Sequence, residues 1–379
     1  MSLITTTLGK LTKIQTGKLD ANVSSEDGEY PFFTCAQKPL RIDSYSYDCE
    51  CVLVAGNGDL NVKYYKGKFD AYQRTYIIEA RSETQENLHI RYVYHFLESY
   101  LEKLREQSIG GIIKYIKLGN LTEAKIPLLP LAEQKRIAAI LDAADALRTK
   151  RRKSLAQLDT LLQSTFLHMF GDPVTNPMGW RKSIIGDLVD NIDSGWSPSC
   201  LDRSANEGEW GVLKLGAVTL CEYRDDQSKA LPDDIKPRPE IEVQKGDLLF
   251  TRKNTYDLVA ACALVHETRP KLMLPDLIFR LRFPQNGGIE PSFVWQQLIN
   301  ARLRKKVQSL ASGAAGSMPN ISKSKLRGVE LIIPPLSLQS HFATIVESIG
   351  KQKARLRTHL AELDVLFASL QARAFNGEL

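Results

Sequence analysis

The sequence predicts an α+β protein in which two globular α/β domains are separated by two long antiparallel helices that pair as a coiled coil. The first observation is an internal repeat: residues 131–170 align without a gap with residues 336–375, so that Leu131 falls on Leu336, 205 positions later. The second is the length of 379 residues, which exceeds what one compact core usually holds. The third is that runs rich in β-branched and aromatic residues precede each helical stretch. The chain is therefore predicted to be pseudo-two-fold.

Four segments follow from this pattern. The predicted segments are a first domain at residues 1–130, a first spacer helix at 131–172, a second domain at 173–335 and a second spacer helix at 336–379. The first helical stretch is followed by Gly171-Asp172-Pro173, which stops a helix.

The composition narrows the class of protein. Hydrophobic residues make up 43% of the chain and charged residues 25%, and no apolar run is long enough to span a bilayer. The N-terminus lacks the basic and apolar regions of a signal peptide. The six cysteines are scattered without a Cys-x-x-Cys pair, which argues against a disulfide scaffold and a structural zinc site. We therefore expect a cytoplasmic protein, and its net charge of +6 permits nucleic-acid binding without requiring it.

The first domain begins with alternating strand and turn signals. Residues 56–68 predict a hairpin, because Gly and Asn tolerate the positive φ of tight turns. Apolar spacing predicts one helix over residues 90–106. A Ser-Ile-Gly-Gly loop at 108–111 and a short strand at 112–116 complete the domain. The predicted strands before the helix are 30–34, 51–55 and 72–79.

The second domain repeats this order and is longer. Its opening Ile185-Gly186-x-Leu188 lies over Leu8-Gly9-x-Leu11 of the first domain. A helix is predicted at 293–309 and a small-residue loop at 312–317. The predicted strands are 211–215, 247–251, 259–265 and 277–283.

The two spacer stretches carry the same apolar pattern. Apolar side chains recur at alternating spacings of three and four, which is typical of a seam between paired helices. Basic residues such as Arg148 and Lys353 interrupt both seams at the same place, and we expect these charges to be solvated or to cover a partner. At about 1.5 Å per residue, each stretch predicts a rod of roughly 60 Å. The predicted inter-helix seam consists of Ile137, Leu141, Leu155, Leu158, Leu162, Phe342, Val346, Leu360, Leu363 and Phe367.

Three motifs carry a resemblance to a known family. They are residues 130–138 (PLAEQKRIA) at the start of the first spacer, 170–173 (FGDP) at its end, and a Trp-x-x-x-x-(Ile/Leu)-Gly-Asp pattern at 180–187. On these motifs the whole chain resembles the specificity (S) subunit of type I restriction–modification enzymes. One departure is Leu338, which stands where the first spacer has Glu133.

The resemblance implies a non-catalytic DNA-recognition subunit of a phage-defence system. Each domain would be a target recognition domain that reads one half of a bipartite, asymmetric target, and the paired helices would fix the spacing and dock the methyltransferase. The implied partners are double-stranded DNA, two methyltransferase (M) subunits and restriction (R) subunits, with no membrane and a nucleoid-associated location. No cofactor is expected in this chain, because S-adenosylmethionine, ATP and magnesium would be bound by the partner subunits.

The candidate DNA-binding residues lie in a few polar stretches. The basic-aromatic stretch 63–68 with Arg74 suits contacts to phosphates and base edges, although lysines on a hairpin edge also serve to block strand pairing. The stretch 252–256 is the best candidate for direct readout, because Arg suits guanine and Asn suits adenine; the alternative is an ordinary polar loop. The Gly-containing loops would let the backbone approach DNA closely or would be plain turns. The full set is Asn57, Lys63, Tyr64, Tyr65, Lys66, Arg74, Gly110, Gly111, Lys114, Arg252, Lys253, Asn254, Tyr256, Ser312, Gly313, Ser317, Asn320 and Lys323.

The sequence shows no catalytic constellation. It has no phosphate-binding Gly motif, and its histidines show no metal-ligand spacing. Two alternatives to the recognition subunit stay open. One is a metal-dependent DNA-processing nuclease that uses the Asp-x-Lys fragment Asp234-Ile235-Lys236, for which no strand supplies an upstream acidic partner. The other is a structural coiled-coil adaptor without a role in DNA affinity.

Overall fold

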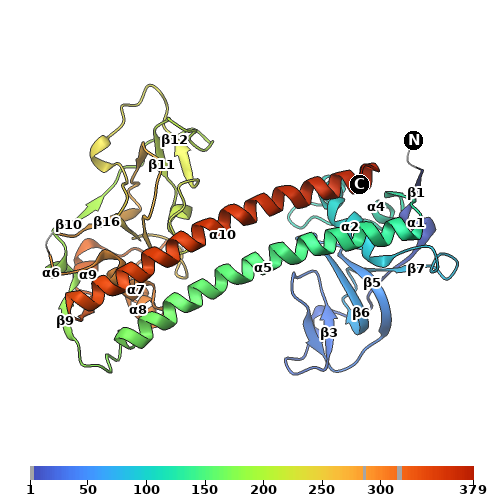
Figure 1. Cartoon of the computed structure of the whole chain (residues 1–379), viewed down its shortest axis with the longest axis horizontal. Helices are drawn as coiled ribbons and strands as arrows, with labels where there is room; N and C mark the ends of the chain where they lie inside the picture. Colours follow the sequence, from blue (N-terminus) through green and yellow to red (C-terminus); the bar gives the residue numbers. More distant parts are fainter. Residues whose placement is uncertain (1–3, 285–286, 314–317) are drawn as a thin grey trace. The chain divides into compact units, whose positions relative to one another are not determined.

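The computed structural model describes residues 4–284, 287–313 and 318–379, which form two compact units (Figure 1). Unit 1 comprises Met1–Lys153 together with Arg357–Leu379, and unit 2 comprises Ser154–Leu356. Each unit therefore combines one α/β body with one half of each long helix. The predicted fold class of two α/β bodies and two long helices is confirmed.

The two bodies begin and end with matching elements and differ in the middle. The elements of the first body are β1 (Thr5–Thr7), α1 (Leu8–Leu11), β2 (Thr12–Thr16), η1 (Ala21–Val23), β3 (Tyr30–Phe33), β4 (Leu40–Ile42), β5 (Tyr47–Ala55), β6 (Val62–Ala71), β7 (Thr75–Ala80), α2 (Ile90–Ser99), α3 (Leu101–Gln107), α4 (Leu118–Thr122) and β8 (Lys125–Pro127). The helix α5 (Leu131–Phe170) follows, with the bounds that the repeat predicts.

The second body opens with the same short elements. Its elements are β9 (Arg181–Ile184), α6 (Ile185–Leu188), β10 (Asn191–Ser194), β11 (Gly211–Leu213), η2 (Leu215–Ala217), β12 (Ser228–Ala230), η3 (Pro239–Ile241), β13 (Leu248–Thr251), β14 (Cys262–Leu264), β15 (Leu272–Met273), β16 (Ile278–Arg282), α7 (Pro291–Ile299), α8 (Ala301–Gln308), α9 (Lys323–Arg327) and β17 (Glu330–Ile333). The helix α10 (Leu336–Asn376) ends one residue beyond the predicted repeat.

The internal repeat extends from the helices into the sheets. Unit 1 contains the strand order β2-β7-β5-β6, and unit 2 contains β10-β16-β13-β14, with every neighbouring pair antiparallel. The strands β3 and β4 extend the first sheet, whereas β11, β12 and β15 form a separate sheet in unit 2. The repeat thus preserves a four-stranded core sheet, which unit 1 extends by two strands and unit 2 accompanies with a separate sheet.

The helices that cover these sheets are shorter than predicted. The sequence predicts single helices at 90–106 and 293–309, but each is broken into two, at Tyr100 and at Asn300. At the second break, the Asn300 side chain accepts hydrogen bonds from the backbone N–H groups of Arg302 and Leu303, which caps a new helix. Both one-helix predictions were wrong. At Asn300 a local cap overrides the apolar spacing, whereas Tyr100 has no side-chain cap and keeps αR backbone angles.

Two strand predictions in unit 1 also need correction. Residues 112–116 form no strand, and only Tyr115 takes part in isolated bridges, with Ile109 and Asn57. Residues 72–74 form a turn before β7, closed by a hydrogen bond from the Thr75 N–H to the Tyr72 carbonyl. The predicted hairpin is confirmed, since β5 and β6 pair antiparallel around residues 56–61.

The long helices pair antiparallel, as predicted. In unit 1, Ile137 and Leu141 of α5 share a core with Phe367 of α10. In unit 2, Leu162 of α5 shares a core with Phe342 of α10. Early residues of one helix therefore meet late residues of the other in both units. Across the described ranges, no helix is both long and apolar enough to cross a membrane.

The predicted seam is buried unevenly. Ile137, Leu141, Leu162, Phe342, Val346 and Phe367 are buried, whereas Leu155, Leu158, Leu360 and Leu363 are only half-buried. The buried positions are those where a globular body adds a third layer over the two helices. Among the half-buried positions, Leu158 still packs against the core of unit 2. Burial therefore varies along the seam, and the full set of seam residues stays a prediction.

The basic interruptions of the seam are paired rather than solvated. Arg148 Nε lies 2.6 Å from Asp364 Oδ1, and its guanidinium lies 4.2 Å from the ring centroid of Phe367. Lys353 Nζ lies 2.5 Å from Asp159 Oδ1. Lys353 and Asp364 are the repeat positions of Arg148 and Asp159, so the same cross-helix ion pair occurs once in each unit. The expectation of solvated charges was wrong for these two residues, because the carboxylates come from the opposite helix.

A buried glutamine joins each long helix to its α/β body. Gln134 Oε1 accepts the backbone N–H of His89, and Gln339 Oε1 accepts that of Glu290. Each Nε2 donates to the carbonyl oxygen of the fifth residue before it. Because a buried amide left without these partners is costly, the two glutamines hold the start of α5 against α2 and the start of α10 against α7.

Unit 1 adds a charged contact at the same junction. The Asp142 carboxylate of α5 accepts hydrogen bonds from Arg91 and lies 2.7 Å from Nε2 of the buried His95. We expect Asp142→Asn to lower the free energy of unfolding of unit 1 by about 2 kcal/mol at neutral pH, because Arg91 and His95 lose their charged partner. Hydrogen exchange of the α2 amides measures this. Glu347→Gln at the repeat position is the control, because Glu347 is exposed and its side chain pairs only with Lys351 on its own helix among the described ion pairs.

The same contact sets a pH dependence. Burial alone would raise the pKa of Asp142, but the hydrogen bonds from Arg91 and His95 outweigh it and hold that pKa below its ordinary value. Stability from a lowered carboxyl pKa is present above the unfolded pKa of about 4 and is lost as pH falls through the folded pKa. The difference between wild type and Asp142→Asn should therefore shrink in acid. A difference that stays constant down to low pH would contradict this account.

Candidate nucleic-acid interface

In unit 2, two distant segments close into one loop cluster. Ser312 and Asn320 exchange backbone hydrogen bonds of 3.0 Å in both directions, and Asn320 forms a bridge with Lys253. The Ile321 N–H donates to the Arg252 carbonyl at 2.8 Å. The end of β13 is thereby joined to the segment before α9. We call residues 252–256, 312–313 and 318–323 the loop cluster of unit 2; it contains every described residue predicted to bind DNA in this unit.

An aromatic ring organises the charges of this cluster. Arg252 Nε donates to Asn320 Oδ1 at 3.1 Å, and the guanidinium lies 5.0 Å from the ring centroid of Phe279. Lys323 Nζ lies 5.7 Å from the same centroid. A guanidinium held by a ring and an amide loses little side-chain entropy when it binds a further acceptor. The cluster is thus preorganised to donate hydrogen bonds to an anionic or polar partner.

The remaining predicted residues of unit 2 differ in accessibility. Asn254 is only 7% exposed, its Oδ1 accepts the Thr255 N–H, and direct contact with a base would require this loop to open. Tyr256 and Gly313 are exposed. Ser317 lies outside the described residues.

Unit 1 builds an equivalent loop cluster from residues 56–58 and 109–116. Ile109 and Tyr115 exchange backbone hydrogen bonds of 3.0 and 2.8 Å, and Tyr115 forms a bridge with Asn57. The Ile116 N–H donates to the Gly56 carbonyl at 2.9 Å. These are the same backbone contacts that close the loop cluster of unit 2, at the same place relative to the core sheet.

The loop cluster of unit 1 gathers only some of the predicted residues. Asn57, Gly110, Gly111 and Lys114 belong to it, and the Gly58 N–H donates to the Lys114 carbonyl. Arg74 is adjacent, because its carbonyl accepts the N–H of Gly56. The basic-aromatic stretch 63–68 does not join this cluster and lies along β6 instead.

The side chains of that stretch have partners within the fold. Tyr64 donates to Glu50 at 2.8 Å, and burial together with this bond raises the pKa of Tyr64 to about 12. Lys66 lies 3.1 Å from the same Glu50 carboxylate. Tyr65 packs on aromatic rings on the other side of the sheet, and burial lowers the pKa of Lys63. Their role in binding DNA stays a prediction, and Lys66 is the most exposed among them.

Sequence reasoning missed two features of the loop clusters. Phe279 supports Arg252 and Lys323 from the neighbouring strand β16, a contact that depends on strand register. Ile112 and Ile113 are exposed at the tip of the loop in unit 1. For these isoleucines the sequence did contain a signal, namely the Gly110-Gly111 pair directly before them. A Gly-Gly dipeptide marks a turn rather than a strand.

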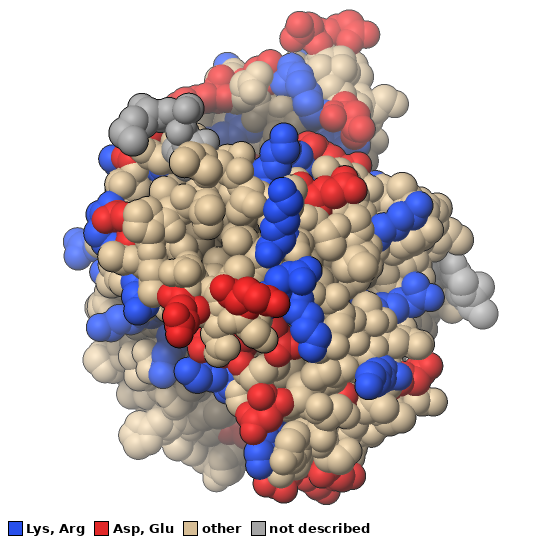
Figure 2. Space-filling model, turned by 90° about the vertical axis from the view of Figure 1, so that its right-hand side faces the viewer, with Lys and Arg blue, Asp and Glu red and all other residues tan. Residues whose placement is uncertain are grey.

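One face of the molecule carries charges of both signs. On the face seen in Figure 2, Lys and Arg side chains are interspersed with Asp and Glu side chains rather than gathered into one broad basic surface. This distribution fits the modest net charge of +6. The loop clusters therefore remain the candidates for contacts to a nucleic acid.

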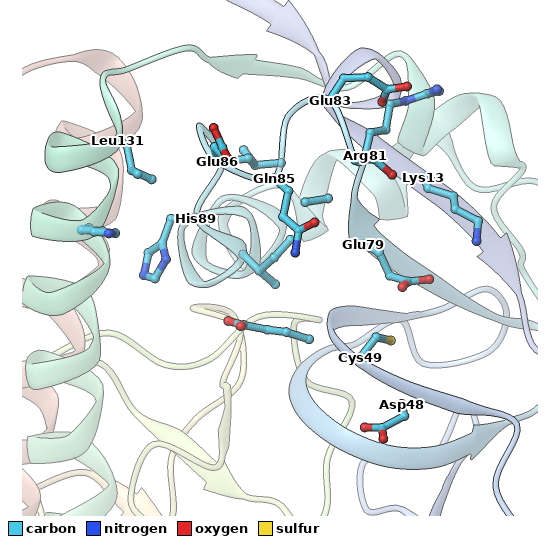
Figure 3. Close-up of a pocket in the computed structure, with 16 residues that line it drawn as sticks. Lys13, Asp48, Cys49, Glu79, Arg81, Glu83, Gln85, Glu86, His89 and Leu131 are labelled. Carbon is cyan, nitrogen blue, oxygen red and sulfur yellow. The ribbon is translucent and has the colours of Figure 1, made fainter.

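Unit 1 also contains an open pocket of about 870 Å³ (Figure 3). Its lining comes from β2, β5, β7, the 81–89 segment and the start of α5, and it mixes both signs of charge. The charged lining residues are Asp48, Glu50, Glu79, Glu83, Glu86, Lys13, Arg81 and Lys135. Within the part of the chain that is described, no group of His, Cys, Asp and Glu side chains could hold a metal ion. The pocket thus shows neither the pattern of a metal site nor that of a phosphate site.

The comparisons with known proteins agree on one family. Residues 5–158 match the family model of the type I restriction modification DNA specificity domain. The chain is 26% identical to the specificity subunit of the type I restriction enzyme EcoDI from Escherichia coli, over 99% of this chain and 88% of that one. It is 36% identical to the EcoEI specificity subunit from Escherichia coli, over 50% of this chain and 32% of that one.

A solved structure shows the same fold. It is the crystal structure of the type I restriction–modification S subunit from M. genitalium, which matches with a TM-score of 0.64 and 17% sequence identity. The match covers 99% of this chain and 96% of that one.

Proposed function

The chain belongs to the family of specificity subunits of type I restriction–modification systems, and we propose that its two α/β bodies read the two halves of a bipartite, asymmetric DNA target. The observation that carries this proposal is the duplicated loop cluster. The same backbone contacts close both clusters, but unit 1 presents Asn57 and Tyr115 where unit 2 presents Lys253 and Asn320. A shared scaffold with different side chains suits two readers of different base sequences.

The paired helices suit a role as spacer and docking element. The ion pairs Arg148–Asp364 and Lys353–Asp159 recur at repeat positions, which supports a defined helix register. Leu161 and Leu366 also occupy repeat positions, and both are about half exposed, at 51% and 49%. Two equivalent apolar positions are what two copies of one partner would require. We infer that these partners are two methyltransferase subunits, with restriction subunits joining the complex.

The chemistry would lie on those partners. This chain would contribute no catalytic group, and S-adenosylmethionine, ATP and magnesium would be bound by the other subunits. The complex would act in the cytoplasm, on the DNA of the nucleoid. Glu133 at the start of α5 and Leu338 at the start of α10 occupy repeat positions. A partner subunit would therefore meet a charged side chain at one helix start and an apolar side chain at the other.

Methylome sequencing tests this function directly. When the chain is co-expressed with its cognate methyltransferase, we expect adenine methylation at one split, non-palindromic motif and at no other new motif. Cells that express the methyltransferase with an empty vector provide the control. Methylation without a split motif, or no methylation from an assembled complex, would contradict the proposal.

Assays on the purified chain and on the complex distinguish the recognition subunit from the two alternative functions. Metal-dependent cleavage of DNA by the purified chain, abolished in Asp234→Ala, would support the nuclease instead. A complex that binds DNA equally well with and without this chain would support the adaptor, because phosphate-contacting proteins give steep salt dependence and an adaptor adds none.

A further inference from the structure

The tip of the unit 1 loop cluster exposes an unusual apolar pair. Ile112 is fully exposed and Ile113 is 63% exposed. Their neighbours Ile109 and Tyr115 are also more than a third exposed, at 42% and 38%. Large apolar side chains that gather at one exposed place mark a binding surface more often than isolated ones do.

The loop that carries this pair is firmly attached at its base. The Ile109–Tyr115 backbone pair closes the loop, and the Gly58 N–H donates to the Lys114 carbonyl at 2.9 Å. The Tyr76 hydroxyl donates to the Ile116 carbonyl at 3.1 Å. The tip is therefore held on the core sheet while its two isoleucines have no cover within the described chain.

Glycine makes the tip narrow. Gly110 adopts φ of +117°, and a Cβ atom there would lie 2.5 Å from the Ile113 carbonyl oxygen. Gly111 has open space around it. A side chain at Gly110 would widen the turn, so the sequence at this tip favours a thin loop that ends in two branched apolar side chains.

The surroundings of the tip indicate DNA rather than protein as its occupant. Lys114 is exposed on the same loop, and Asn57 and Arg74 lie at its base. The loop cluster of unit 2 likewise holds Arg252, Asn320 and Lys323. Donors suit phosphates and base edges, and two side chains are too small an apolar area to hold a folded protein.

We propose that Ile112 and Ile113 form a wedge that enters a base-pair step of duplex DNA from the minor groove and unstacks it. The inference rests on the proposed function of unit 1 and assigns it a mode of recognition. Apolar side chains inserted in this way kink DNA, and the cost of unstacking depends on the step. The wedge would thus select an easily deformed step in the first half-site, such as a pyrimidine–purine step, without a hydrogen bond to its bases.

The test uses the complete complex of this chain with its methyltransferase subunits on DNA that carries its methylome-defined target. 2-Aminopurine is placed in turn at each position of the first half-site, and its fluorescence reports unstacking. We compare wild type with Ile112→Ala/Ile113→Ala, and with Val23→Ala as a matched control, because Val23 is an exposed apolar residue elsewhere in unit 1. Fluorescence energy transfer between the DNA ends measures bending.

We expect a fluorescence increase at one step with wild type and with Val23→Ala, and its loss in the double variant together with a straighter duplex. Affinity for the target should fall roughly ten- to a hundredfold in the double variant, with the salt dependence unchanged, because no phosphate contact is removed. A signal from a base flipped by the methyltransferase is distinguished because it persists in the double variant.

Two results would overturn the wedge while leaving the recognition function intact. One is normal methylation of a split motif with no step whose fluorescence depends on the isoleucines. The other is a double variant that binds DNA as wild type does but no longer retains its methyltransferase subunits, which would assign the tip to a protein contact. Absence of any split motif would instead contradict the proposed function itself.

Discussion

A complex that carries Arg252→Ala is expected to lose discrimination at one base pair of the second half-site. The guanidinium is oriented by Asn320 Oδ1 and by the ring of Phe279, so it is ready to make paired hydrogen bonds to a base edge. A good bidentate contact to guanine contributes about 1–3 kcal/mol of discrimination, which is roughly a ten- to hundredfold preference. Methylation rates on targets substituted at each position measure the change.

Arg302→Ala provides the comparison. Arg302 is exposed on α8, where it pairs with Asp172 at 3.3 Å, outside the loop cluster of unit 2. We expect this variant to keep the sequence preference of wild type. If Arg252→Ala instead weakened binding to all sequences equally and reduced the salt dependence, Arg252 would contact phosphate rather than a base.

Unit 2 is expected to be strongly destabilised by Arg280→Met. Arg280 is 1% exposed, and its guanidinium contacts Asp193 at 2.9 Å and Asp247 at 3.1 Å. It also donates to the backbone carbonyls of Glu240 and Glu242. Loss of one partner from a buried ion pair costs about 3–5 kcal/mol. In this variant Asp247 loses its partner among the described ion pairs, whereas Asp193 keeps Arg282 at 2.8 Å. Chemical denaturation with a probe in unit 2 measures the loss.

A compensating variant separates charge from packing. In Arg280→Met/Asp193→Asn/Asp247→Asn the two carboxylates become neutral, and we expect most of the lost stability to return. If the triple variant were as unstable as Arg280→Met, the packing of the arginine and its backbone contacts, rather than its charge, would account for the effect.

The pH dependence of the single variant has a definite sign. Burial would raise the pKa of Asp193, but hydrogen bonds from Arg282 and Arg280 outweigh it and hold the pKa below its ordinary value. The stability that the Asp193 carboxylate gains from these hydrogen bonds is present above its unfolded pKa of about 4. It disappears as pH falls through the folded pKa of Asp193. The deficit of Arg280→Met should therefore be largest at neutral pH and smaller in acid.

The large-scale organisation was readable from the sequence because its signals are local and repeated. The bounds of α5 came from a gapless repeat and a following Gly-Asp-Pro stop. The pairing of the two helices followed from two equal apolar patterns that need a partner, and their antiparallel direction from the family resemblance. The breaks at Tyr100 and Asn300 escaped this reasoning, because apolar spacing continues through both of them.

The candidate site was readable as residue types but not as an arrangement. Arg252, Lys253, Asn320 and Lys323 were proposed as DNA contacts from polarity, position and the family resemblance, and the fold brings them together. Their support by Phe279 escaped prediction, because it depends on the register between β13 and β16. Asn254 was chosen for the same chemistry, yet its loop turns it inward.

By itself, the sequence determined the repeat, the helix lengths and the alternation of body and helix, since each depends on periodicity within one segment. Only the tertiary structure decided which charges meet. Arg148 and Asp364 are far apart along the chain, and so are Arg252 and Asn320. Such pairs form only after helices and strands have packed in one register, because local propensities carry no information about which distant side chain will face them.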